Sequence, residues 1–300
     1  MSQRNDEGDL LKGAAFLVAG FSVIPLMDAA AKDLGGQGYA PVLTAWGRFA
    51  VSALILSPVL LKRGRLKQMT GPGAGMQVIR AVMLALATVM FFSALVTMPM
   101  ADALAVYFIY PFLITLFAPF VLGETVGLRR LMAVAIGFAG SLLIIRPGFQ
   151  EVPSGVYYVL GACVCFSLFN LLTRRLSGMS DPWLTVFYQS IVGAVVLTPF
   201  MIAHWQMPDP AAMKLMALMI ASAIFGHWLL IKAYEQAPAS HLAPFGYFEM
   251  ISTVTLGYLW FGDLPDVLTW GGIAVIVATG IYISVRERKR KQGLRAEGAP

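Results

Sequence analysis

Ionisable residues stand in the middle of long apolar stretches of this 300-residue chain. The clearest are Asp28, His227 and Glu249, each flanked by apolar residues. Polar groups are costly in hydrocarbon, so those retained there face a bundle interior, pair together or line a cavity. A buried carboxylate such as Glu249 could accept the ammonium group of a small molecule or carry a proton. The alternative is an interhelical hydrogen bond to a neighbouring Tyr or His, which is common in helix packing in lipid.

Other side chains at similar depth suit the recognition of a small molecule. The polar and aromatic candidates are Thr88, Asn170, Tyr107, Tyr110, Tyr247 and Trp228. For Asp28, an ion pair with Lys32 one helical turn later is an alternative role. Arg48 stands near a span end, where snorkelling to the interface or pairing with a carboxylate is expected. Pro25, Pro111 and Pro244 interrupt three stretches, and we expect hinges there because proline removes a backbone hydrogen bond.

These residues must be positioned by transmembrane helices. A helix needs about 20 mostly apolar residues to cross the hydrocarbon core of a bilayer. Ten stretches meet this condition approximately, and turn residues such as Gly71, Gly73, Pro147 and Gly148 separate them. The ten predicted spans are residues 11–31, 41–61, 78–97, 103–122, 128–145, 154–173, 183–203, 213–234, 241–261 and 267–285.

The distribution of basic residues predicts the orientation. Cytoplasmic loops collect Lys and Arg. With the N-terminus inside, all of the 22 Lys and Arg residues reach the cytoplasmic side except Lys32, Arg48, Arg146, Lys214 and Lys232. We therefore expect both termini in the cytoplasm, with a multi-pass chain in a bacterial-type inner membrane. The net charge of +6 is explained by topology and gives no signal of nucleic-acid binding.

Composition excludes several other classes of protein. Hydrophobic residues make up 58% of the chain and charged residues 13%, which does not fit a water-soluble domain. The two cysteines, Cys163 and Cys165, lie within one apolar stretch and supply neither a disulfide framework nor a zinc site. We expect no metal and no cofactor. The polar N-terminus lacks the basic start and cleavage site of a secretory signal, so the first stretch is expected to be a permanent span.

The second half of the chain repeats the first. Residues 139 positions apart match at Ala94 and Ala233, Pro99 and Pro238, and Gly123 and Gly262. Each half holds five predicted helices, so the second half must enter the membrane with opposite polarity, as in many secondary transporters. The repeat places three pairs of polar residues at equivalent positions, namely Asp28 with Asn170, Thr88 with His227, and Tyr110 with Glu249. A pseudo-twofold axis in the membrane plane brings such pairs towards the midplane.

Two segments carry a family resemblance that covers nearly the whole chain. Residues 94–101 leading to Gly123-Glu124, and residues 233–240 leading to Gly262-Asp263, resemble the paired signature of EamA-type carriers of the drug/metabolite transporter superfamily. Asp263 departs from the Glu usual in the family. Length and helix number are most similar to ten-helix inner-membrane exporters of amino acids, including aromatic ones. The resemblance implies a central cavity lined by helices one, three, four, six, eight and nine, alternating access, and no covalent chemistry.

The expected protein is an all-α membrane protein with ten transmembrane helices in two inverted five-helix repeats around a central cavity. The tails are residues 1–10 and 286–300, and the repeats are 11–147 and 153–285. The expected function is secondary export of amino acids or similar small metabolites, with the bilayer as partner and a proton as a possible coupling ion. Export of cationic drugs or other metabolites is the alternative. An intramembrane enzyme or a channel is disfavoured, because neither a catalytic motif nor a filter sequence is present.

Overall fold

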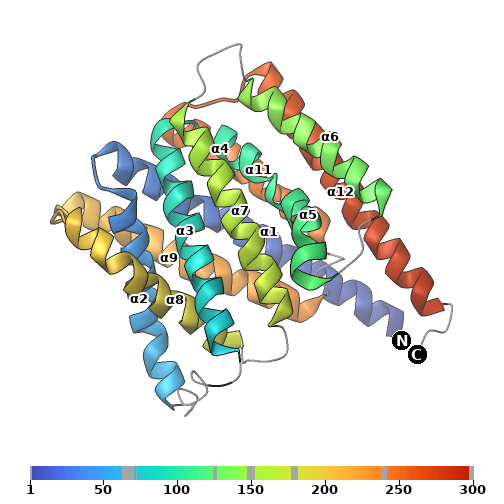
Figure 1. Cartoon of the computed structure of the whole chain (residues 1–300), viewed down its shortest axis with the longest axis horizontal. Coiled ribbons are helices and arrows are strands. Elements are labelled where there is room, and N and C mark those ends of the chain that lie inside the picture. The colour runs from blue at the N-terminus through green and yellow to red at the C-terminus, as the bar shows by residue number, and fades with distance from the viewer. Residues whose placement is uncertain are drawn as a thin grey trace.

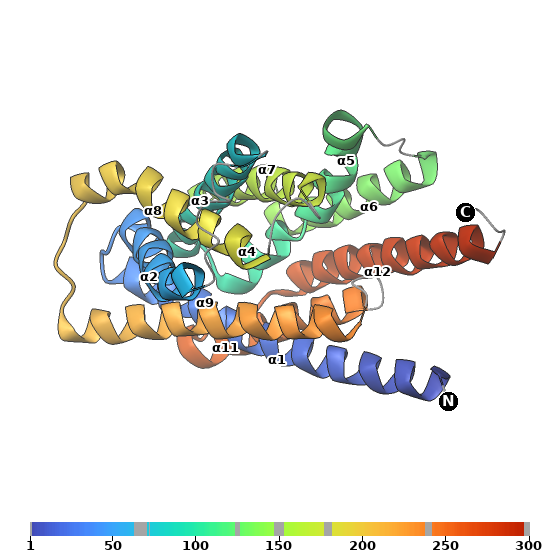
Figure 2. The same ribbon diagram turned by 90° about the horizontal axis from the view of Figure 1, so that it is seen from below.

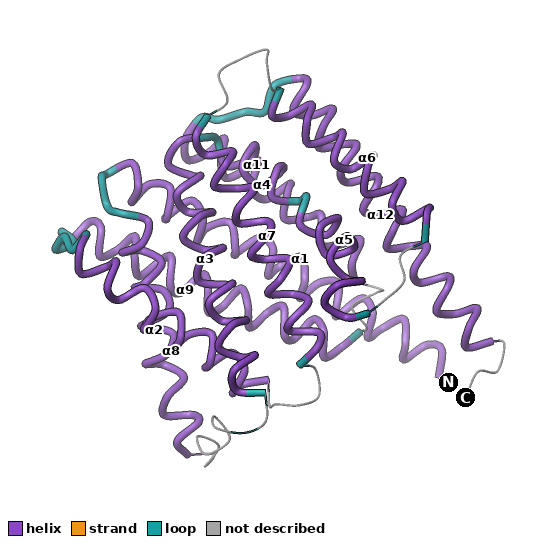
Figure 3. Tube along the Cα trace, viewed as in Figure 1, coloured by secondary structure: helices purple, strands orange, loops and turns teal. Residues whose placement is uncertain are grey.

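The computed structural model describes residues 2–62, 71, 73–123, 127–146, 153–176, 182–237 and 242–296. In these residues the fold is entirely helical (Figures 1 and 3). The elements are α1 (Ser2–Gly36), α2 (Pro41–Lys62), α3 (Ala74–Thr97), α4 (Met100–Tyr107), α5 (Tyr110–Leu122), α6 (Leu128–Ile145), α7 (Ser154–Arg175), α8 (Pro182–Ala203), α9 (Pro210–Gln236), the 3-10 helix η2 (Ala243–Tyr247), α11 (Phe248–Phe261) and α12 (Val267–Ala296).

Each predicted span overlaps one helix, or one pair of consecutive helices, of the described chain, and the predicted all-helical membrane fold is confirmed. Six helices or helix pairs are long and apolar enough to cross a bilayer by themselves, and α6 and α12 contribute shorter apolar stretches. The ends differ from the prediction. In particular, α1 begins nine residues before the predicted position 11, and α12 continues to Ala296 rather than ending at 285. Polar helix turns that extend beyond the hydrocarbon carry no apolar signal, so hydropathy does not detect them.

Two of the predicted spans are broken, at equivalent points of the repeat. The span 103–122 is divided into α4 and α5 at Phe108–Ile109, and the span 241–261 begins as the 3-10 helix η2 and becomes α-helical at Phe248. Pro111 explains the first break, because it has no N–H to donate to the carbonyl four residues before it. Pro244 lies within η2. Pro25, by contrast, lies inside α1, which is continuous from Ser2 to Gly36.

The helices form two facing layers in which the repeats are interleaved (Figure 2). In one layer α1, from the first repeat, packs mainly on α9 and α11 from the second; in the other, α7 packs mainly on α3, α4 and α5. Beside these layers, α2 pairs with α8 and α6 pairs with α12. Glycine permits the closest approach: a Cβ on Gly20 would lie 3.2 Å from the Gly226 carbonyl oxygen, so α1 and α9 touch backbone to backbone.

Candidate functional site

A cavity of about 580 Å³ lies between the two layers. This volume falls within the range of sites for small molecules. Its wall includes residues from α1, α3, α4, α5, α7, α9, η2 and α11, the elements that correspond to helices one, three, four, six, eight and nine. α2 also contributes, through Arg48, and α8 contributes through Gln189. The interleaving of the repeats therefore builds one site from both halves of the chain.

Eight of the nine predicted binding residues line this cavity: Asp28, Thr88, Tyr107, Tyr110, Asn170, His227, Tyr247 and Glu249. The ninth, Trp228, lies outside it. Its ring stacks on Phe225 at 5.7 Å between centroids, and the residue is 41% exposed. Trp228 points about 100° away from His227 around α9 and packs against Phe225 outside the cavity.

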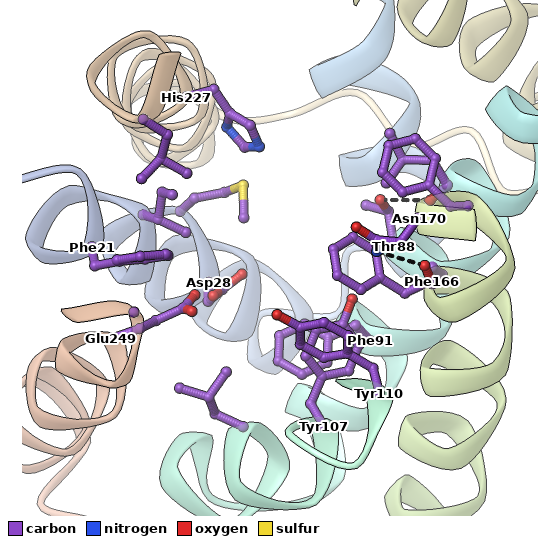
Figure 4. A pocket seen from close by; sticks show the side chains of 18 of the residues that line it. Phe21, Asp28, Thr88, Phe91, Tyr107, Tyr110, Phe166, Asn170, His227 and Glu249 are labelled. Carbon is purple, nitrogen blue, oxygen red and sulfur yellow. Dashed lines mark hydrogen bonds between the residues drawn. The ribbon is translucent and has the colours of Figure 1, made fainter. Parts of the chain in front are cut away.

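Two carboxyl groups from different repeats lie next to each other on one side of the cavity (Figure 4). Asp28 extends from α1 and Glu249 from the first turn of α11. Asp28 is only 5% exposed, and its Oδ1 atom is buried without a hydrogen-bond partner among the described residues. It does not pair with Lys32, whose Nζ atom instead lies 2.8 Å from Asp263 Oδ2. The cavity thus holds acceptor capacity that the described protein does not satisfy.

Arg48 is a charged residue of the cavity wall that the sequence analysis did not assign to a site. Its Nη1 atom donates a long hydrogen bond of 3.4 Å to Thr88 Oγ1, and its guanidinium lies 5.4 Å from the centre of the Phe49 ring. Its charge interacts with that of Asp28, although the two groups are not in ion-pair contact. A guanidinium has five N–H donors, so Arg48 keeps most of its donors for something else.

Three polar side chains on the wall are oriented by bonds to their own helices. Thr88 donates to the Leu84 carbonyl at 2.9 Å, and Asn170 donates to the Phe166 carbonyl at 2.7 Å. His227 Nδ1 lies 2.7 Å from the Ala223 carbonyl oxygen, so Nδ1 carries a proton and donates it to that carbonyl. Each bond fixes one polar atom. The Oδ1 atom of Asn170 and the Nε2 atom of His227 remain available to the cavity.

Aromatic rings form the wall opposite α1. Tyr107 contacts the rings of Phe91, Tyr110 and Phe166 at centroid distances of 4.7, 5.5 and 5.4 Å. Tyr247 continues this surface through Phe108 at 5.6 Å. Such rings offer flat apolar faces and can also interact with cations.

The helix break next to this wall is supported by α7. Ser167 Oγ donates to the Tyr110 carbonyl at 3.0 Å, and Cys163 Sγ lies 3.4 Å from the Tyr107 carbonyl. The Cys163 contact satisfies the Tyr107 carbonyl, which Pro111 leaves without a helical donor, and the Ser167 bond adds a second link between α7 and the start of α5. Cys163 is buried and has this packing role. Among the described residues, no three His, Cys, Asp or Glu side chains are grouped as a metal site would require.

One end of the cavity is closed by the ends of α1, α3, α4 and α11, here termed the closed end. Ala30, Leu34, Ala94 and Met100 fill it with buried side chains. Lys32 Nζ lies 2.8 Å from Asp263 Oδ2 in its own layer and donates to the Met98 carbonyl, at the C-terminus of α3 in the other layer, at 3.2 Å. The closed end therefore joins the two layers through a cation at a helix C-terminus, a favourable arrangement.

A second ion pair, at the junction of α6 and α12, reinforces that end of the bundle. Arg146, just after α6, pairs with Asp266, just before α12, and Asp266 also accepts from the Thr269 backbone N–H at 2.8 Å. The hydrogen bond from Arg146, together with that from Thr269, holds the pKa of Asp266 well below its usual range.

At the opposite end of α3, Arg80 is almost fully buried and bonded to neutral acceptors. It reaches Thr173 Oγ1 on α7 at 3.1 Å, and the Thr185 carbonyl and Gln189 Oε1 on α8 at 2.8 and 3.3 Å. Its guanidinium lies 4.9 Å from the centre of the Phe169 ring. Arg80 thereby joins α3, α7 and α8 next to the cavity, which Gln189 also lines.

Comparison with known proteins agrees with this architecture. The EamA-like transporter family matches residues 12–146 and again 153–286. A solved structure titled "Crystal structure of protein" superposes with a TM-score of 0.64 at 17% identity, covering 94% of this chain and 98% of that one, which supports the fold.

Three relatives span nearly the whole chain and are named as transporters. The S-adenosylmethionine uptake transporter of Rickettsia prowazekii is 23% identical, over 93% of this chain and 94% of that protein. The riboflavin transporter of Vibrio cholerae is 25% identical, over 94% and 96%. The pseudopaline exporter CntI of Pseudomonas aeruginosa is 28% identical, over 92% and 97%. The chain is therefore a multi-pass membrane transporter, not an enzyme, and belongs to the EamA-like transporter family.

Proposed function

We propose that this chain is a secondary transporter that exports amino acids or similar small metabolites across a bacterial-type inner membrane by alternating access. The observation that carries the proposal is the cavity between two layers of helices, which is closed at one end and holds charged side chains that form no ion pair among the described residues. Each layer combines helices of both repeats. Such inverted repeats allow one half of the bundle to rock against the other around a central site.

In this proposal both termini lie in the cytoplasm, as the distribution of Lys and Arg predicts. The end of α1 at Gly36 then faces the outside, so the closed end is the external one. The cavity extends from this end along α1 as far as Leu17 and along α9 as far as Tyr234, towards the cytoplasm. The described conformation is accordingly the one that would accept a substrate from the cytoplasm, as an exporter requires.

Amino acids are the favoured substrates because the cavity provides groups for both of their charges. Arg48 can bind a carboxylate in bidentate geometry, and Asp28 or Glu249 can accept an ammonium. The aromatic wall suits a flat or apolar side chain. The named substrates of the relatives, S-adenosylmethionine and pseudopaline among them, show how varied the cargo of this family is.

Export of cationic drugs or other metabolites is the second candidate. The neighbouring carboxyl groups of Asp28 and Glu249, together with Tyr107 and Tyr110, would suit an organic cation through ion pairing and cation–π contact. Arg48 distinguishes the two candidates, because a positive charge on the wall disfavours a cation that brings no carboxylate.

Counterflow in proteoliposomes tests the proposed function. Protein-dependent uptake of a labelled amino acid that saturates, and that is accelerated by the same amino acid on the opposite side, is expected of a carrier. Linear, unsaturable flux without exchange would contradict alternating access. Glu249→Gln should impair this activity, whereas Glu235→Gln should not, because Glu235 is half exposed and pairs with Lys232 on the surface of α9. If Glu249 carries a coupling proton, the pH dependence of wild-type flux should flatten in Glu249→Gln.

A further inference from the structure

The packing of helices within one layer is repeated in the other. The repeat relates α1 to α7, α3 to α9 and α11 to α5, and it aligns Lys32 near the end of α1 with Arg174 near the end of α7. α1 packs mainly on α9 and α11, and α7 packs in the same way on their counterparts, α3 and α5. The two layers are therefore built alike, each from the first helix of one repeat and later helices of the other.

Contacts between the layers, by contrast, are not repeated. At the closed end α1 contacts α3 and α4 contacts α11, and Lys32 links the layers through the Met98 carbonyl at 3.2 Å. The counterpart pairs are α7 with α9 and α5 with η2, and these make no comparable contact in the part of the chain that the structure describes. The described conformation thus contains one set of contacts between the layers and lacks the equivalent set.

The ends of α7 and α9 lie at the other end of the bundle, in opposite layers (Figure 2). Arg80, near the start of α3, bonds to Thr173 near the end of α7 at 3.1 Å. A Cβ on Gly13, in the first half of α1, would lie 3.2 Å from the Ala233 carbonyl oxygen near the end of α9. Since the ends of α1 and α3 form the closed end, the ends of α7 and α9 must lie at the opposite one.

The cavity extends between these two helix ends. Asn170 and Tyr234 line it, within the last two turns of α7 and α9 respectively. Tyr234 is 51% exposed, whereas Leu95, its counterpart at the closed end, is 1% exposed. The equivalent position is therefore packed at one end of the bundle and open at the other.

The two helix ends that would receive a cation have the same backbone geometry. Met98 follows α3 with φ −147° and ψ 159°, and Ala237 follows α9 with φ −146° and ψ 151°. Each donates its N–H to the carbonyl four residues earlier, at 3.1 and 3.2 Å. A proline comes next in the sequence in both places, which favours this extended conformation. The Ala237 carbonyl is therefore directed from α9 as the Met98 carbonyl is from α3, at a helix C-terminus that favours a cation.

We propose that in the alternate conformation α7 docks on α9 and Arg174 donates to the Ala237 carbonyl. This bond is the counterpart of the bond between Lys32 and the Met98 carbonyl, and it forms when that bond breaks. The inference rests on the proposed function and names the residues that close the cavity in its second state. Each layer is held together by its own packing, so movement of one layer against the other closes one end as it opens the other.

A distance between the layers tests the inference without a ligand. Spin labels are attached at Phe120→Cys on α5 and Glu235→Cys on α9, both exposed, after Cys163 and Cys165 are replaced by Ala. In nanodiscs, double electron–electron resonance on the full-length protein should show the distance of the described conformation and a shorter one. Lys32→Met should increase the population with the shorter distance about 5- to 30-fold, the effect of one charged hydrogen bond that water partly screens. A distance that shortens in neither protein would overturn the inference.

Variants of Arg174 then identify the bond. In the Lys32→Met protein, Arg174→Met should reduce the population with the shorter distance by a similar factor, about 5- to 30-fold. Arg174→Lys should retain it, because a lysine has this position in the first repeat. Arg175→Met is the matched control, since Arg175 Nη1 donates to the Val121 carbonyl of its own layer at 3.2 Å and should not affect docking. Equal losses in Arg174→Met and Arg175→Met would refute the role of Arg174.

Two outcomes separate this inference from the proposed function. Saturable counterflow of an amino acid, by a protein in which α5 and α9 never approach each other, would overturn the docking of α7 on α9 and leave the carrier function intact. A shortening that depends on Arg174, in a protein that carries none of the amino acids tested, would support the docking and reject the export of amino acids.

Discussion

Replacement of Lys32 by Met should open the closed end. The side chain of Lys32 is 16% exposed and is held by Asp263 in its own layer. Its bond to the Met98 carbonyl, at 3.2 Å, connects the two layers. Methionine preserves the apolar part of the side chain and removes both the charge and the donors. The variant therefore removes one polar link between the layers while most of the packing at that end remains.

The size of the effect follows from this geometry. A hydrogen bond from a charged group contributes about 1.5–3 kcal/mol to stability. Partial exposure of Lys32 allows water to compete, so we expect about 1–2 kcal/mol. Since 1.4 kcal/mol corresponds to a factor of ten, the population open at this end should rise about 5- to 30-fold. Lys232→Met is the matched control, because Lys232 pairs with Glu235 three residues later on a half-exposed surface of α9.

Cysteine labelling measures the open population. Ala87 lines the cavity, and a cysteine there, after replacement of Cys163 and Cys165 by Ala, should be reached from the outside only when the closed end opens. In Lys32→Met, the rate of reaction with an impermeant maleimide in intact cells should increase about 5- to 30-fold. An unchanged rate would refute the assignment of Lys32 as the link between the layers, as would an equal increase in Lys232→Met.

Three further predictions concern other parts of the bundle. Gly280→Ala should weaken substrate affinity several-fold although α12 does not line the cavity, because a methyl group at Gly280 would overlap the Tyr247 hydroxyl; an unchanged KM would contradict this. The Arg146 hydrogen bond lowers the pKa of Asp266, so its stabilising contribution is present above the unfolded value of about 3.9 and is lost as the pH falls through the folded value. On acidification from pH 7 to pH 3, Tm should therefore fall more in the wild type than in Asp266→Asn, and equal falls would count against the ion pair. Pro111→Ala supplies the missing backbone N–H and should slow maximal counterflow at normal abundance, whereas an unchanged rate would exclude a hinge there.

Much of the site could be inferred from sequence because the chain is duplicated. The repeat paired Asp28 with Asn170 and Tyr110 with Glu249, and the cavity contains all four residues. Each of the ten apolar stretches coincides with one helix or helix pair of the described chain. Both signals are properties of the whole fold, since apolar length is set by the bilayer and the repeat by inverted symmetry. Neither depends on the details of side-chain packing.

Details that depend on packing could not be inferred. Arg48 has a position in the outer third of its span, and position alone allows it to reach either the interface or the interior. Only the neighbours of α2 show that it lines the cavity. Pro111 indicates the break at Phe108–Ile109, whereas α1 is continuous although it contains Pro25. A proline removes one hydrogen bond in both places, and whether the helix breaks is decided by the neighbours that satisfy the freed carbonyl.

The interleaved layers have a consequence for how the chain is assembled. The first helix of each repeat packs mainly on helices of the other repeat, α1 on α9 and α11, and α7 on α3, α4 and α5. The two repeats thus pack like the two subunits of a domain-swapped, antiparallel dimer whose chains have been fused into one. Residues 1–146 would leave the backbone contact surface around Gly20 facing lipid, because its counterpart, Gly226, is made later. The unit that was duplicated in the sequence is therefore not the unit that packs.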